Sequence, residues 1–151
     1  MSTDYSIFMC CKGPVAEKVR WFNSVDGVSI DSNGTARIAG LDDVRILGLD
    51  ERNRMIMMED YGSYGIDVNW EIMGTLSDAN EILDVIQRLY RCFAAIANAY
   101  PNENCSLMRN GESFLAMNTS SQLLISPTYL KAIPVIQSLF VKSWQLSAMD
   151  Y

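Results

Sequence analysis

Apolar residues at helical spacing predict the longest element of this chain, a helix over residues 78–100. Ser77 or Asp78 can cap its N-terminus, with Glu81 three residues after the aspartate, and Pro101 stops it. One face of this helix is apolar at intervals of three or four residues, which predicts that it faces a core: Ile82, Val85, Ile86, Leu89, Phe93, Ile96 and Tyr100.

A strand and a shorter helix are predicted near the N-terminus. Tyr5–Cys11 is a short apolar run bounded by Gly13-Pro14, which indicates a strand followed by a break. Residues 14–25 carry Val15, Val19 and Phe22 at helical spacing, so an amphipathic helix is expected there.

Two Asn-Gly pairs predict β-hairpins, because both residues tolerate the positive φ angles of a type I′ turn. The expected strand pairs are Val28–Ile30 with Thr35–Ile38 around Asn33-Gly34, and Cys105–Arg109 with Glu112–Asn118 around Asn110-Gly111. A further strand is expected at Leu123–Ile125.

The middle of the chain is predicted to be strand-rich. Val44–Leu49 and Arg54–Glu59 are expected to pair around the turn at residues 50–53, and Tyr61–Gly65 to form a connector. In the next segment, Ile66–Ile72, polar and apolar residues alternate. That pattern predicts a strand with one apolar side, Ile66, Val68, Trp70 and Ile72, and one solvent-facing side, Asp67, Asn69 and Glu71.

The C-terminal region is predicted to be helical. Ser126-Pro127 opens it, and Pro134 splits it because proline disrupts a helix interior. The main helix is expected over residues 133–147, with an inward face formed by Ile136, Leu139, Phe140 and Trp144.

Hairpin-linked strands separated from a few helices predict an α+β fold, an antiparallel sheet built from hairpins with helices packed on one face. The chain has 151 residues, a length typical of one domain, so residues 1–151 are interpreted as a single globular domain.

The chain contains no histidine, which limits the chemistry it can perform. Histidine is the usual general base near neutral pH, so Ser-His-Asp triads, Cys-His pairs and histidine-ligated zinc sites are excluded. The four cysteines, Cys10, Cys11, Cys92 and Cys105, form no Cys-x-x-Cys motif, and they are expected to be free thiols. Neither a catalytic residue, a metal site nor a cofactor is predicted, and the protein is expected not to be an enzyme.

The net charge of −6 is unevenly distributed. Residues 26–84 contain thirteen acidic and four basic side chains, a net charge of −9. Such a surface repels nucleic acid and anionic membranes and attracts basic proteins.

The N-terminus has no basic segment followed by an apolar core, and no apolar run is long enough to span a bilayer, so a cytoplasmic location without membrane association is expected. Arg88 and Arg91 fall on the outer side of the long predicted helix and are expected to be solvated.

Aromatic residues beside acids in this segment suggest a surface for a basic protein partner, because tyrosine and tryptophan often anchor interfaces. Met55, Met57 and Met58 fit either core filling or an adaptable binding face. The adjacent acids within each pair should point to opposite faces of a strand, which disfavours a shared catalytic site. The residues expected to contact the partner are Asp42, Asp43, Glu59, Asp60, Tyr61, Tyr64, Asp67, Asn69 and Glu71.

In layout the chain resembles the small, acidic, cytosolic immunity proteins that bacteria keep beside secreted toxins. The resemblance rests on the expected α+β domain, on the acidic middle segment and on the late hairpin Asn110-Gly-Glu-Ser-Phe114 before a final helix. It covers most of the chain and contains no specific motif. It implies an inhibitor that covers the active site of a toxin or a nearby surface.

Two alternatives remain open. One is an acidic secretion chaperone or adaptor that holds an unfolded effector segment on an exposed apolar face. The other is an enzyme that acts through carboxylates or a cysteine. A large exposed apolar patch and a dimer favour the chaperone, whereas a deep pocket with converging carboxylates favours the enzyme.

Overall fold

The structure, a computed structural model, describes residues 3–31, 33–61 and 67–147, with the side chains of residues 60 and 61 excepted. Its strands are β1 (Thr3–Met9), β2 (Val28–Ile30), β3 (Ala36–Ile38), β4 (Asp42–Gly48), β5 (Trp70–Leu76), β6 (Cys105–Arg109), β7 (Ser113–Asn118), β8 (Leu123–Ile125) and β9 (Gln145–Leu146). Its α-helices are α1 (Val15–Val19), α2 (Glu51–Tyr61) and α3 (Ile82–Ala99). Short 3₁₀ helices are η1 (Arg20–Ser24), η3 (Ala79–Glu81), η4 (Pro127–Tyr129) and η5 (Pro134–Ser138).

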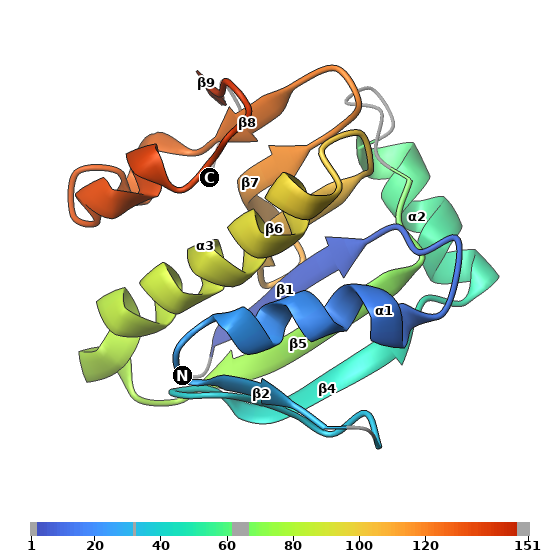
Figure 1. Ribbon diagram of the computed structural model, residues 1–151, viewed down its shortest axis with the longest axis horizontal. Coiled ribbons are helices and arrows are strands. Elements are labelled where there is room, and N and C mark those ends of the chain that lie inside the picture. The colour runs from blue at the N-terminus through green and yellow to red at the C-terminus, as the bar shows by residue number, and fades with distance from the viewer. Residues whose placement is uncertain (1–2, 32, 62–66, 148–151) are drawn as a thin grey trace.

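The strands form a seven-stranded sheet in the order β4-β5-β1-β6-β7-β8-β9, and β2 and β3 form a small separate sheet (Figure 1). Neighbouring strands run antiparallel throughout, except that β8 and β9 are parallel. The predicted α+β class is therefore confirmed. The main sheet is mixed because its last strand returns from the C-terminal segment.

Helices α1 and α3 lie on the same face of the sheet, where the main core forms (Figure 1). The predicted stripe on α3 is confirmed, because Val85, Ile86, Leu89, Phe93 and Ile96 are all buried. They pack with the inward residues of the strands, which include Ile7, Leu107, Leu115 and Ile125. The helix predicted over residues 14–25 is also present, as α1 followed by η1.

A second, smaller cluster lies on the opposite face of the sheet. Phe8, Met108 and Met117 are buried there with Met57, which comes from α2. Helix α2 lies at the end of the sheet where β1 and β4 finish (Figure 1). It therefore sits apart from the α1 and α3 layer.

The prediction of a strand at Arg54–Glu59 is wrong, because these residues belong to helix α2. The Asp50 side chain accepts a hydrogen bond from the Asn53 backbone N–H at 2.7 Å, as an N-cap does, and the Arg54 N–H bonds to the Asp50 carbonyl at 3.0 Å. Methionine and arginine favour helices, and the run at 54–58 lacks the polar–apolar alternation of a strand.

The strand predicted at Ile66–Ile72 is displaced toward the C-terminus and appears as β5, Trp70–Leu76. Ile66 lies outside the described residues, and Asp67–Asn69 precede the strand. Val68 and Ile72 are buried as predicted, but on different faces of the sheet. Val68 belongs to the second cluster, whereas Trp70, Ile72 and Leu76 pack in the main core. The pairing of β1 with β5 along its whole length fixes these bounds.

The helix predicted over residues 133–147 is wrong. The segment contains the short η5 and then β9, which pairs with β8. Tertiary hydrogen bonds replace helical ones: Asn98 donates to the Leu139 carbonyl at 2.9 Å and accepts from the Val141 N–H at 3.0 Å. The inward residues are still as predicted, with Ile136 buried and the other three partly buried against the core: Leu139, Phe140 and Trp144.

Both Asn-Gly hairpins are confirmed, as β2–β3 and β6–β7. Asn110 and Gly111 have φ angles of 53° and 66°, as a type I′ turn requires. The expectation for Arg88 is wrong, because its guanidinium donates to the carbonyls of Asp26 and Ala39 and so ties α3 to the β2–β3 hairpin.

Candidate functional site

The predicted binding residues are spread over several elements, beginning with Asp42 and Asp43 on the edge strand β4. The Asp42 carboxylate accepts a hydrogen bond from the Ser77 hydroxyl. Asp43 is exposed with a φ of 51°, at the irregularity where the β4–β5 register shifts. These two acids therefore lie at the start of β4, whereas α2 follows its other end.

The predicted solvent-facing row is wrong for Asn69 and Glu71, which are partly buried and engaged within the molecule, whereas the Asp67 side chain is 44% exposed and pairs with Arg54. The Asn69 amide accepts from the Cys11 N–H at 2.8 Å and donates to the Cys11 carbonyl at 2.9 Å. Glu71 accepts from the hydroxyl of buried Ser6 at 2.6 Å. The partly buried placement of Asn69 and Glu71 leaves these two side chains poorly suited to a rim contact.

Three more of the predicted residues belong to α2 or follow it. Glu59 is on α2 with an exposed side chain. Asp60 and Tyr61 complete the same helix, but their side chains lie outside the described part of the chain, as does all of Tyr64. Of the predicted acids, Glu59 is thus the one that the structure places on the exposed face of α2.

The same helix carries an unusual amount of exposed apolar side chain. Met55 is 54% exposed, Ile56 43% and Met58 46%, and Leu47 at the end of β4 is 36% exposed. The other large exposed apolar residues are scattered over α1–η1, α3 and the C-terminal segment: Trp21, Leu83, Val141 and Leu146. Met55 and Ile56 line the same hollow, and grouped exposed apolar side chains mark interaction sites in folded proteins.

We call this region the α2 surface: Leu47, Asp50, Glu51, Arg52, Met55, Ile56, Met58 and Glu59. Six of these residues border a shallow hollow of about 550 Å³: Asp50, Glu51, Arg52, Met55, Ile56 and Glu59. Three of those six are acidic and one is basic. The α2 surface therefore combines an apolar centre with a mainly acidic border.

Met57 and Arg54 attach α2 to the rest of the molecule. Met57 is buried on the back of the sheet, and Arg54 forms a two-pronged ion pair with Asp67 at 3.0 and 3.1 Å. Both residues point away from the exposed face that holds Met55 and Ile56, because residues two positions apart lie on opposite sides of a helix. The α2 surface is thus held in place without being covered by its anchors.

The α2 surface was only partly foreseen from the sequence. The methionine run was recognised as a possible binding face, but the assignment of residues 54–59 to a strand hid which methionines share a side. In the helix, Met57 is buried, whereas Met55 and Met58 are exposed. Ile56 was missed because its neighbours give no clear helical period.

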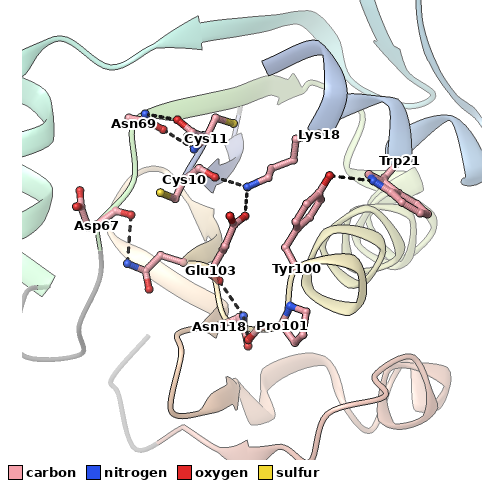
Figure 2. Close-up of polar contacts among 11 residues, drawn as sticks. Cys10, Cys11, Lys18, Trp21, Asp67, Asn69, Tyr100, Pro101, Glu103 and Asn118 are labelled. Atoms are coloured by element: carbon pink, nitrogen blue, oxygen red, sulfur yellow. Dashed lines mark hydrogen bonds and ion pairs between the residues drawn. The ribbon is translucent and has the colours of Figure 1, made fainter. Parts of the chain in front are cut away.

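A second cluster of polar groups surrounds Lys18, which is only 5% exposed (Figure 2). Its ammonium group donates to the Cys10 carbonyl and to the Glu103 carboxylate. It also lies 4.4 Å from the centre of the Tyr100 ring, and the Tyr100 hydroxyl accepts from the Trp21 indole N–H at 3.3 Å. These contacts join α1, the end of β1 and the turn after α3.

The turn itself is held by two asparagines. Asn118 donates to the carbonyls of Pro101 and Glu103, and Asn104 donates to the Asp67 carbonyl (Figure 2). Every donor named here has an acceptor inside the protein. The Lys18 cluster therefore acts as a structural anchor with its hydrogen bonds already satisfied.

The thiols beside this cluster are poor nucleophiles. Burial raises the pKa of Cys11 despite the opposing charge of Lys18, and burial raises the pKa of Cys105 as well. Burial also raises the pKa of Cys92 on α3 to about 12. Because the thiolate is the reactive form, these three groups stay protonated and unreactive at neutral pH. All four cysteines are free thiols in the structure.

Comparison with protein-family models, with curated proteins and with solved structures finds no match for this chain. In the part of the chain that the structure describes, no group of three cysteine, aspartate or glutamate side chains is placed to hold a metal ion. Over the same residues, no helix is both long and apolar enough to cross a bilayer.

Proposed function

We propose that this protein is a non-enzymatic binding protein that holds a protein partner on the α2 surface. One observation carries the proposal: among the described residues, four of the eight large exposed apolar side chains belong to the twelve residues from Leu47 to Met58. Aliphatic and methionine side chains grouped in this way bind best when a partner removes them from water.

The border of the α2 surface indicates the chemistry of the partner. Asp50, Glu51 and Glu59 surround the apolar centre, and residues 26–84 carry a net charge of −9. A partner with an apolar patch inside a basic rim fits this arrangement, since complementary charges speed association and exclude wrong partners.

The specific form of this function is an immunity-type inhibitor that neutralises a toxin by covering its active site or a nearby surface. The acidic character of the α2 surface supports it, because an acidic inhibitor suits a toxin with a basic surface. The resemblance in layout to small acidic immunity proteins supports it as well. No step of this function needs a catalytic residue in the chain.

The test compares one variant of the α2 surface with a matched control. Tagged wild-type protein, Ile56→Asp and Leu83→Asp are used to capture proteins from the source cell at low and high salt. Leu83 is 46% exposed on α3, close to the 43% of Ile56, but lies outside the α2 surface. We expect wild type and Leu83→Asp to capture the same protein and Ile56→Asp to lose it.

The inhibitor function is then tested with the captured protein. It should be toxic when expressed alone, and co-expression of wild type or Leu83→Asp should restore growth where Ile56→Asp does not. Capture that is equally strong with Ile56→Asp would place the binding site elsewhere. A captured protein that is harmless alone would contradict the inhibitor function.

The exposed apolar residues also favour a second function, that of an acidic secretion chaperone or adaptor. Such a protein binds an unfolded segment, whereas an inhibitor binds a folded surface. If synthetic peptides from the captured protein bind wild type as tightly as the whole protein does, the chaperone is favoured. If only the folded protein binds, the inhibitor is favoured.

A further inference from the structure

Four residues of α2 form a stripe along the exposed side of the helix: Arg52, Met55, Ile56 and Glu59. Their spacing of three, four and seven residues places them on one face. All four side chains are exposed, and Met57, which is buried, lies on the other side of the helix. The stripe has two apolar residues in the middle, a cation at its N-terminal end and an anion at its C-terminal end.

We propose that a second copy of this chain docks on the stripe, with the two α2 helices packed antiparallel about a two-fold axis. The proposal concerns the same surface as the proposed function and rests on it in one respect: the second copy covers the α2 surface while the partner is absent. Exposed apolar residues are thereby kept from unspecific association.

The order of residues in the stripe makes it complementary to itself. A two-fold axis midway between positions 55 and 56 brings position 52 opposite position 59, and Met55 opposite Ile56. Each Arg52 then faces Glu59 of the second copy, and the symmetry forms this ion pair twice. A parallel arrangement would instead put arginine beside arginine and glutamate beside glutamate.

The size of the stripe indicates a weak association. Helix α2 has 11 residues and is therefore about 16 Å long. Two such helices bury less than the roughly 1,200 Å² of a stable specific interface. A contact of this kind forms at high protein concentration and yields to a partner that offers a larger complementary surface.

The first measurement is the mass in solution by sedimentation velocity, from about 10 μM to about 1 mM, the range that corresponds to weak affinity. We expect the wild-type mass to rise from 17.0 kDa toward twice that value. Arg52→Glu places two glutamates opposite each other, and Glu59→Arg places two arginines opposite each other. Each variant alone should remain a monomer across this range.

Mixing the two variants is the decisive experiment, because it tests whether the ion pair between the two copies can be restored. An Arg52→Glu chain carries two acids on the stripe and a Glu59→Arg chain carries two bases, so an equimolar mixture should form a one-to-one dimer. The double variant Arg52→Glu/Glu59→Arg should dimerise by itself, with the ion pair reversed. Circular dichroism and the melting temperature of each variant establish that it is folded.

A wild-type protein that stays monomeric at 1 mM overturns the proposal, and so does a dimer that persists in both single variants. Capture of the partner at nanomolar concentration, where the self-association is absent, tests the proposed function separately. If wild type captures the partner but never dimerises, only the dimer proposal fails, and the same holds if Ile56→Asp loses capture while wild type stays monomeric. If wild type and Ile56→Asp capture the partner equally well, the proposed function fails.

Discussion

Lys18 and Glu103 form a largely buried ion pair although 85 residues separate them in the chain. The side chain of Lys18 is 7% exposed and that of Glu103 28%. The pair fastens α1 to the turn that connects α3 with β6 (Figure 2). Because the ammonium group also holds the Cys10 carbonyl, one side chain links three segments of the molecule.

Lys18→Met should lower the free energy of unfolding by about 2–4 kcal/mol. The methionine fills a similar volume but leaves the Glu103 carboxylate and the Cys10 carbonyl without their donor, and breaking a buried pair costs several kcal/mol. Urea denaturation followed by circular dichroism measures the change. Lys131→Met is the control, because Lys131 is exposed, and it should alter stability little. Equal effects of the two variants would show that the Lys18 cluster is not an anchor.

Arg88→Ala should destabilise the protein by about 1–2 kcal/mol, since it deprives two backbone carbonyls of a donor. Arg91→Ala, three residues along the same helix, tests the general effect of removing an arginine from α3. A drop in melting temperature for Arg88→Ala and a smaller one for Arg91→Ala is the expected result. If neither variant lowers the melting temperature, the hydrogen bonds between Arg88 and the β2–β3 hairpin do not stabilise the protein in solution.

Thiol titration should separate one cysteine from the other three. Cys10 is partly exposed, whereas Cys11, Cys92 and Cys105 are buried. In native protein we expect a single thiol to react promptly with an aromatic disulfide reagent at pH 8 and three to react only after unfolding. Denatured protein kept without reductant should titrate as four thiols, and a smaller number would reveal a disulfide.

Stability should fall in alkaline solution because of the buried Cys92 thiol. Its pKa is about 12 in the folded protein, against an ordinary value of 9.0. Below pH 9 the thiol is neutral in the folded and in the unfolded protein, so its contribution to the free energy of unfolding is fully present. Between pH 9 and about 12 the unfolded chain ionises first, and stability is lost as pH rises, by at most about 1.4 kcal/mol per pH unit.

The variant Cys92→Ala tests this dependence through its slope rather than its absolute stability. From pH 9 to pH 10.5 its free energy of unfolding should decline less steeply than that of wild type. Leu89→Ala is the matched control, because it truncates a buried side chain of the same helix that does not titrate, and it should keep the wild-type slope. Parallel slopes for all three proteins would be evidence against a neutral buried thiol at position 92.

Charge reversal on the α2 surface should slow association with the captured partner. Glu51 and Glu59 are both exposed, so Glu51→Lys/Glu59→Lys should leave the fold intact. Rim charges act mainly on the rate of encounter. We expect a lower on-rate with a weaker salt dependence, measured at two ionic strengths with nanomolar protein. An on-rate that is unchanged at both ionic strengths would show that the charged contact with the partner lies outside α2.

Asp67→Lys with Glu71→Lys is a less suitable test, because those acids already bind Arg54 and Ser6 within the molecule.

Part of the candidate site could be predicted from the sequence. The acidic middle segment, Glu59 and the methionine run were recognised, because charge and residue type are properties of the chain itself. Whether Met55 and Met57 share a side depends on the secondary structure, and the run Met-Ile-Met-Met has the period of neither a helix nor a strand. The Asp50 cap and the Arg54–Asp67 pair accompany the helix in the folded protein.

The sequence alone determined the α+β class, helix α3 and both Asn-Gly hairpins, because these depend on periodicity and on local backbone preferences. Leu89 and Phe93 repeat at helical spacing whatever surrounds them, and Asn110-Gly111 accepts positive φ angles without help from the rest of the fold. Only the tertiary structure decided the start of β5 and the C-terminal segment. At those places the backbone hydrogen bonds and ion pairs reach distant residues, as between Asn98 and Val141 or Asn69 and Cys11, and local sequence patterns carry no information about partners that far along the chain.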